Sequence, residues 1–142
     1  MSSVNQSKGF ETLVDVLQRR AAETPDALAY GFLKSGSDVQ RLTYHELDLM
    51  AKRVAVLIGQ KIKAGGSALI CHHPGLEYVV SFYGCLYAGV TAIPIYPPRF
   101  NQKLERLASI AETIDVRVAL TSKNVLDSIA PLLADSPSLS HI

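Results

Sequence analysis

The residue types that could do chemistry gather in one short stretch, Cys71-His72-His73, which follows an apolar run. Thiolates and imidazoles bind zinc, and a cysteine beside a histidine can form a nucleophile and its base. Adjacent residues of an extended segment point in opposite directions, however, so they chelate poorly. No second cluster of ligands and no third orienting group follows in the sequence. We therefore expect no metal ligand and no catalytic residue in this chain.

Phosphate binding is the second chemistry to consider, because it needs a glycine-rich turn that precedes a helix. The glycine pair Gly65-Gly66 precedes a predicted strand instead, and neither GxGxxG nor GxxxxGK[ST] occurs. The turn at His72, Pro74 and Gly75 could hold an anion only weakly, and an ordinary strand-to-helix turn is the favoured interpretation. We expect no cofactor to be bound by these residues.

Aromatic residues recur at helical spacing in the apolar segment from Leu76 to Ala88. Tyr78 and Phe82 are four residues apart, and so are Tyr83 and Tyr87. Core packing is the simpler interpretation of this pattern. A wall of an apolar ligand cavity is the sharper one, because buried phenols need polar partners and often line pockets. The residues themselves leave both interpretations open.

A strand, a helix and a second strand are predicted to position these residues, over 68–71, 76–88 and 90–95. Pro74 suits the first turn of the helix, and Gly89 suits the left-handed position beyond its end. Apolar residues lie nearly all round this helix, apart from Glu77 and Ser81, which predicts that it is buried. A crossover of this length implies parallel strands with both sheet faces covered.

The residues before this unit predict a helix, a hairpin and a second helix. Thr12 can cap the first helix, which ends before Pro25. Strands over 27–33 and 39–42 flank a predicted five-residue loop at 34–38. Thr43 and Glu46 then form a capping box, with a hydrophobic staple from Leu42 and Leu47. The apolar spacing continues this second helix to Ile58.

The residues after the central unit predict a helix, a strand and a last helix. Asn101 can cap the first of these, and the strand is expected over 116–121. Ser122 can cap the last helix, which Pro131 should kink or restart. We expect a flexible tail at 1–10 and a tail at 136–142. Between them we expect one incomplete α/β subdomain at 11–135 with a mostly parallel sheet, flanking helices and an N-terminal β-hairpin.

Composition excludes several classes of protein. The 142 residues carry a net charge of +1, so no strong field attracts nucleic acid or an anionic membrane. No apolar run is long enough to span a membrane, and the N-terminus lacks the apolar core of a signal peptide. Cys71 and Cys85 lie in apolar runs, which favours buried free thiols and a cytoplasmic location, with a disulfide between them left open.

Several stretches together resemble the extreme N-terminal part of the fatty acyl-AMP ligases, which belong to the adenylate-forming superfamily. The run GCLYAGV…IPIYPPR is similar to this branch specifically. The motif LTYHEL and the LYAGV…P run correspond to the first two core motifs of adenylation domains, which are structural there. The residues that carry the resemblance are Thr12–Val14, Arg20-Ala21, Pro25–Tyr30, Leu42–Leu47, Pro74–Tyr78, Phe82–Val90, Pro94 and Tyr96–Arg99.

The resemblance implies an enzyme that activates a fatty acid with ATP and Mg²⁺ and passes the acyl group to an acyl carrier protein, in lipid, polyketide or nonribosomal peptide synthesis. The family's ATP loop, its ribose-binding aspartate and its C-terminal lysine have no match in this chain. We therefore expect a part that is inactive without the remainder of the adenylation domain. A non-catalytic module for carrier-protein docking or self-association is the alternative, and a carrier of small apolar ligands is a weaker third hypothesis.

Overall fold

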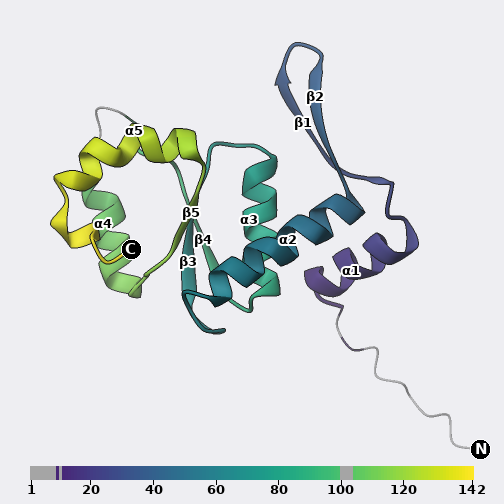
Figure 1. Cartoon of the computed structure of the whole chain (residues 1–142), viewed down its shortest axis with the longest axis horizontal. Helices are drawn as coiled ribbons and strands as arrows, with labels where there is room; N and C mark the ends of the chain where they lie inside the picture. Colours follow the sequence, from purple (N-terminus) through teal and green to yellow (C-terminus); the bar gives the residue numbers. More distant parts are fainter. Residues whose placement is uncertain (1–8, 10, 100–103) are drawn as a thin grey trace, which may run out of the picture.

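A β-hairpin, a parallel sheet and the helices that cover it make up the structure, a computed structural model that describes residues 9, 11–99 and 104–142 (Figure 1). The helices are α1 (Leu13–Glu23), α2 (Tyr44–Gly59), α3 (Leu76–Tyr87), α4 (Glu105–Ile114), α5 (Lys123–Ala134) and a 3₁₀ helix, η1 (Pro137–Leu139). The strands are β1 (Leu28–Ser35), β2 (Asp38–Thr43), β3 (Ser67–Cys71), β4 (Thr91–Ile95) and β5 (Ala119–Thr121).

The parallel sheet has the order β4-β3-β5, with β3 in the middle. Helices α2 and α3 lie on one side of it, and α4 and α5 lie on the other (Figure 1). One buried cluster joins β3 to α2 and α3, through Ile58, Ala68, Ile70, Cys85 and Val90. A second joins β3 to α5, through Cys71, Val125 and Ile129. The predicted α/β architecture with a parallel sheet is confirmed.

The end of α3 follows the predicted glycine signal. Gly89 has a φ of 66°, in the left-handed region. The Val90 N–H donates to the Cys85 carbonyl at 2.9 Å, and both side chains are buried, which completes a Schellman motif. The start of α3 differs from the prediction, since Gly75 is its N-cap and Pro74 lies outside the first turn. The extended backbone at Gly75 delays the helix by two residues relative to Pro74.

Helix α2 begins with the predicted capping box. The Glu46 N–H donates to Thr43 Oγ1 at 3.2 Å, and the Thr43 N–H donates to Glu46 Oε2 at 2.8 Å. Leu42 and Leu47 are both buried in one cluster with Leu17 of α1, as the staple requires. The cap therefore fixes both where α2 starts and how the hairpin enters it.

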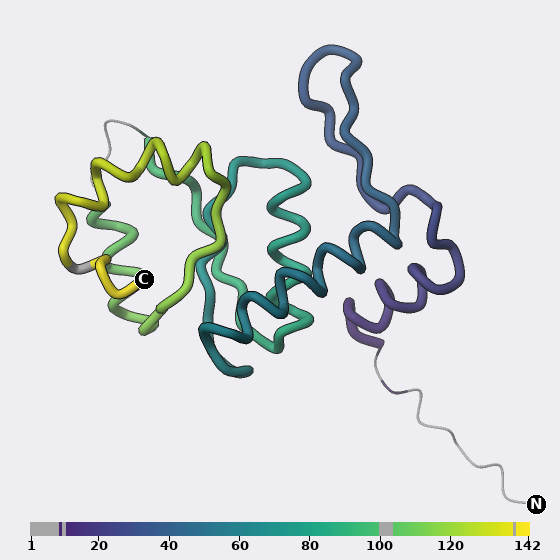
Figure 2. Tube along the Cα trace, viewed as in Figure 1, coloured from purple at the N-terminus to yellow at the C-terminus, as the bar shows by residue number. Residues whose placement is uncertain are grey.

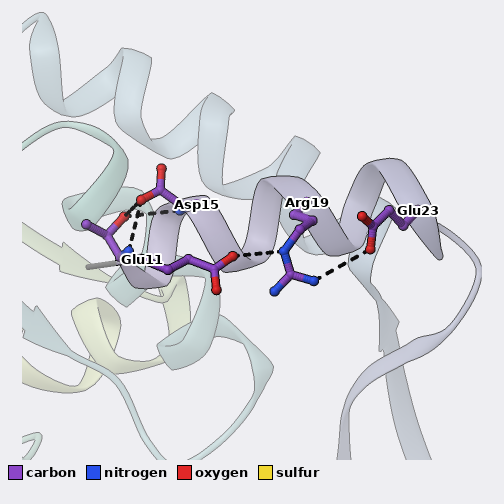
Figure 3. A network of polar contacts seen from close by, with 5 residues as sticks. Glu11, Asp15, Arg19 and Glu23 are labelled. Atoms are coloured by element: carbon purple, nitrogen blue, oxygen red, sulfur yellow. Dashed lines mark hydrogen bonds and ion pairs between the residues drawn. The ribbon is translucent and has the colours of Figure 1, made fainter. Parts of the chain in front are cut away.

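Helix α1 begins with a second capping box, between Thr12 and Asp15. Arg19 lies between two glutamates on the exposed side of α1, with its Nε 2.8 Å from Glu11 Oε1 (Figure 3). Its Nη1 lies 3.5 Å from Glu23 Oε2. These ion pairs are solvent-exposed, so they contribute little to stability.

The hairpin projects away from the sheet as one continuous double strand (Figure 2). The turn is tighter than the predicted loop, because β1 continues to Ser35 and β2 starts at Asp38. Gly36 allows this with a φ of 55°, a conformation that tight hairpin turns need.

Strand β5 is shorter than predicted, because the chain before it completes the end of α4. Asp115 is left-handed, with a φ of 50°, and the Val116 N–H donates to the Ala111 carbonyl at 3.1 Å. Val116, the first residue of the expected strand, therefore forms its hydrogen bond with the end of α4. Its side chain is nevertheless fully buried in the core.

The last residues differ from the tail that the sequence predicts. Helix α5 runs through Pro131 without a break, and η1 follows it. Leu139 is buried against Leu104 and Ala111, so this segment packs on α4. The predicted cap Asn101 and, apart from Gly9, the predicted tail at 1–10 lie outside the described residues. Every helix within the described ranges is too short or too polar to cross a bilayer.

Candidate functional site

The candidate site lies where the three parallel strands end. His72 directly follows β3, Tyr96 follows β4, and Ser122 follows β5. After β3 the chain forms α3 on one face of the sheet and then β4, which pairs with one edge of β3. It next forms α4 on the opposite face and then β5, which pairs with the other edge of β3. The helices after β3 and β5 therefore diverge, which opens the kind of crevice in which open α/β sheets bind ligands.

His72 is the polar centre of this crevice. His72 is only 9% exposed, and its Nε2 lies 2.9 Å from Ser81 Oγ of α3. The other ring nitrogen, Nδ1, is buried and finds no hydrogen-bond partner among the described residues. Burial lowers the pKa of His72, and the nearby Glu77 carboxylate partly raises it again. The lowered pKa keeps the imidazole neutral near pH 7.

Two cavities meet at His72. The larger, of about 600 Å³, lies between α2, the start of α3 and the hairpin, and its apolar wall includes Leu42, Val54 and Val80. The smaller, of about 420 Å³, is lined by His72, Pro74, Tyr78, Pro94, Ile95 and Tyr96. Both volumes are in the range of small-molecule sites. His72 is therefore the residue that the two linings share.

The three residues Cys71, His72 and His73 point in different directions, as an extended segment requires. Cys71 packs under α5 on the opposite face of the sheet, and burial raises the pKa of its thiol. His73 is exposed. No group of three potential metal ligands occurs in the described part of the chain. Both cysteines are free, and Cys85 packs on the other face, in the cluster with α2.

The aromatic residues of α3 do not form one wall. Tyr78 and Phe82 pack against the cluster that covers the sheet, whereas Tyr83 and Tyr87 pack against the cluster of α1 and the hairpin. Phe82 and Tyr83 meet edge to face, with ring centroids 6.0 Å apart. Of the four, Tyr78 is found on a cavity wall, beside His72.

The phenols of Tyr83 and Tyr87 belong to polar contacts between elements. The Tyr87 hydroxyl donates to Asp48 Oδ1 of α2, whose other oxygen lies 2.6 Å from Lys52 Nζ. Burial, followed by the Asp48 carboxylate, raises the pKa of Tyr87. Burial, with a hydrogen bond to Tyr30 of the hairpin, raises the pKa of Tyr83 to about 12. These two residues thus hold α3 to its neighbours.

Sequence reasoning missed the pair of His72 and Ser81. They are nine positions apart and a turn lies between them, so no local spacing rule connects the two. The available signal was Ser81 itself, because a serine inside an otherwise apolar helix is buried and needs a partner.

The sequence and the fold are similar to those of known proteins. Residues 17–141 match the family model described as AMP-binding enzyme. The medium-chain-fatty-acid–[acyl-carrier-protein] ligase JamA of Moorena producens is 40% identical over 116 residues, which cover 79% of this chain and 20% of that protein. The human Disco-interacting protein 2 homolog B is 32% identical over 120 residues, which cover 80% of this chain and 8% of that protein.

Solved structures agree with these relatives. A fatty acyl-adenylate ligase from Legionella pneumophila, in complex with acyl adenylate and pyrophosphate, superposes with a TM-score of 0.79 at 32% identity. The match covers 87% of this chain and 22% of that one. The chain thus spans about a fifth of the length of the ligases that it matches. It belongs to the AMP-binding enzyme family, and it has the fold of the N-terminal part of the fatty acyl-AMP ligases.

Proposed function

We propose that this chain is the N-terminal part of a ligase that joins a fatty acid to AMP with ATP and Mg²⁺. The acyl group then passes to an acyl carrier protein. The chain supplies the core sheet and helices at 11–135, and the remainder of the adenylation domain supplies the groups that hold the phosphates and the metal. Alone, these residues form no acyl adenylate, because nothing in their sequence would stabilise charge on the transferring adenylyl group.

The observation that carries this proposal is the match with fatty acid ligases over nearly the whole chain. The small size of the sheet supports it. The strands β4 and β5 each have one unpaired edge within the described sheet, and β5 has only three residues. Unpaired strand edges normally pair with or are covered by further chain. A longer adenylation domain would provide that chain.

The acyl chain and the compartment are finer points of the same proposal. We assign Tyr78 to the wall of an acyl site because it lines a cavity, and we keep Phe82, Tyr83 and Tyr87 as supports behind it. The two buried free thiols favour a reducing compartment, the cytoplasm.

A complementation assay tests the proposal. The purified chain is mixed with a polypeptide that comprises the remaining residues of the Legionella pneumophila ligase, and acyl adenylate and pyrophosphate are measured with ATP, Mg²⁺ and a panel of fatty acids. We expect product only in the mixture. Product from this chain alone, or none from a mixture whose parts are folded and associated, would contradict the proposal.

A second candidate is a non-catalytic module for self-association or for docking a carrier protein. Exposed apolar side chains favour it, with Leu33 of the hairpin 61% exposed and Val56 and Leu57 of α2 63% and 59% exposed. Light scattering on the purified chain separates the two: a stable dimer supports the module, and a monomer that gains activity by complementation supports the ligase.

A further inference from the structure

The unpartnered nitrogen of His72 has a consequence for the ligand of this site. A buried polar atom without a hydrogen bond costs free energy, and native proteins rarely keep one. His72 Nδ1 is such an atom within the described residues, and His72 is one of the residues that line two cavities at the carboxyl edge of the sheet. The position of the ring is fixed by Ser81, which also lines the larger cavity.

The protonation of His72 and its contact with Ser81 limit which ligand groups can form a hydrogen bond with His72 Nδ1. The imidazole is neutral, so one ring nitrogen carries a proton and donates a hydrogen bond, and the other nitrogen accepts a hydrogen bond. If the Ser81 hydroxyl donates to Nε2, Nδ1 is a donor, and if Nε2 donates to Ser81, Nδ1 is an acceptor. A hydroxyl group both donates and accepts, so it can pair with Nδ1 in either case. A plain alkyl chain can pair with it in neither.

The surroundings of the pair describe the rest of the ligand. Aliphatic side chains of Leu42, Val54, Leu76 and Val80 make up much of the wall of the larger cavity. Gln40 and Arg41 line it on the side of the hairpin, and Glu77 lines it at the start of α3. An apolar chain that carries one polar substituent matches this wall, with a carboxylate suited to the Arg41 side.

We propose that His72, positioned by Ser81, selects fatty acids that carry a hydroxyl group on the acyl chain. The hydroxyl reaches Nδ1 once the side chains that cover this atom move aside; Nε2 keeps its contact with Ser81, and the alkyl part lies against the aliphatic wall. This inference rests on the proposed function for the class of ligand, a fatty acid. It adds a specificity-determining residue and a preferred substrate.

Binding measurements on the purified chain test it. Dissociation constants are measured by calorimetry for saturated fatty acids and for the same acids with one hydroxyl at successive positions. We expect at least one hydroxylated isomer to bind roughly tenfold or more tightly than its parent acid, because pairing one buried polar group is worth that much. In His72→Leu this preference should disappear, whereas in His73→Leu, at the exposed neighbouring histidine, it should persist.

The NMR chemical shift of His72 Nδ1 is a second measurement, and it would not change on addition of a fatty acid if His72 had only a structural role. The preferred acid should shift the Nδ1 signal of His72 and leave that of His73 unchanged. Equal binding of plain and hydroxylated acids by the native chain, or binding of neither, would overturn the inference, whatever the folding of His72→Leu. A shift caused by the remaining part of the Legionella pneumophila ligase without any acid would overturn it too. The complementation assay judges the proposed function separately.

Discussion

The crossing of α2 and α3 allows the sharpest prediction about stability. A Cβ atom added at Gly84 would lie 2.4 Å from Val54 Cγ1 and 2.7 Å from Val54 Cβ. The Val54 Cβ is attached directly to the backbone of α2, so a rotation of the side chain cannot relieve the second contact. Gly84→Ala should therefore force the two helices apart.

The magnitude follows from two opposing effects. Overpacking of a core costs about 1–3 kcal/mol, and a contact this short belongs at the upper end. Alanine favours a helix over glycine by about 1 kcal/mol, which offsets part of that cost. The expected loss of unfolding free energy is about 2 kcal/mol, which lowers the melting temperature by roughly 6–10 °C for a chain of this size.

Thermal unfolding followed by circular dichroism measures this, with Gly59→Ala as the matched control. A Cβ at Gly59, the last residue of α2, meets nothing within 4 Å among the described residues. That variant should be between neutral and about 1 kcal/mol more stable. The cost of Gly84→Ala should also shrink in a Val54→Ala background, which removes the shorter contact. A Gly84→Ala chain that melts at or above the native temperature would refute the tight crossing.

Three further predictions concern a cap, a buried network and a titration. Thr43→Ala should lose about 1 kcal/mol of stability, and Thr43→Ser should keep most of it, because either hydroxyl can cap α2; denaturant titration compares them. Tyr87→Phe should cost about 1–3 kcal/mol, because Asp48, only 8% exposed, loses a donor. The control is Tyr96→Phe, at a residue that is 84% exposed, and equal losses in both variants would contradict the role of Asp48. Because burial lowers the pKa of His72 below 6.5, its contribution to stability should be present above pH 6.5 and should be lost as the pH falls through the lowered pKa. Unfolding free energy measured against pH should show this fall, and a His72→Gln chain with an unchanged profile would argue against it.

The parts of the fold that the sequence predicted are those with a local cause. The capping box at Thr43 and the left-handed Gly89 each depend on residues within a few positions, so the pattern is sufficient to place them. The parallel strands followed from the length of the crossover. The short β5 was not predictable in this way, because Asp115 takes the left-handed position that glycine usually occupies.

The candidate site was less accessible to sequence reasoning. Which face of α3 meets the sheet and which meets the hairpin depends on how α2 and β1 pack, so the division of its aromatic residues into two groups had no local signal. The residue types of the turn at His72 drew attention to it. The partner of His72, Ser81, lies nine positions later, inside α3. Contacts between elements thus decided the site, whereas contacts within elements decided the secondary structure.

A chimeric enzyme tests the central claim most directly. Residues 11–135 of this chain replace the aligned residues of the Legionella pneumophila ligase, and acyl adenylate formation is measured beside the parent enzyme. The account predicts an active chimera, in which Gly84→Ala reduces activity and Gly59→Ala does not. A chimera that folds, as judged by its melting curve, and yet forms no acyl adenylate with any fatty acid tested would contradict the assignment of this chain to the N-terminal part of a fatty acid ligase.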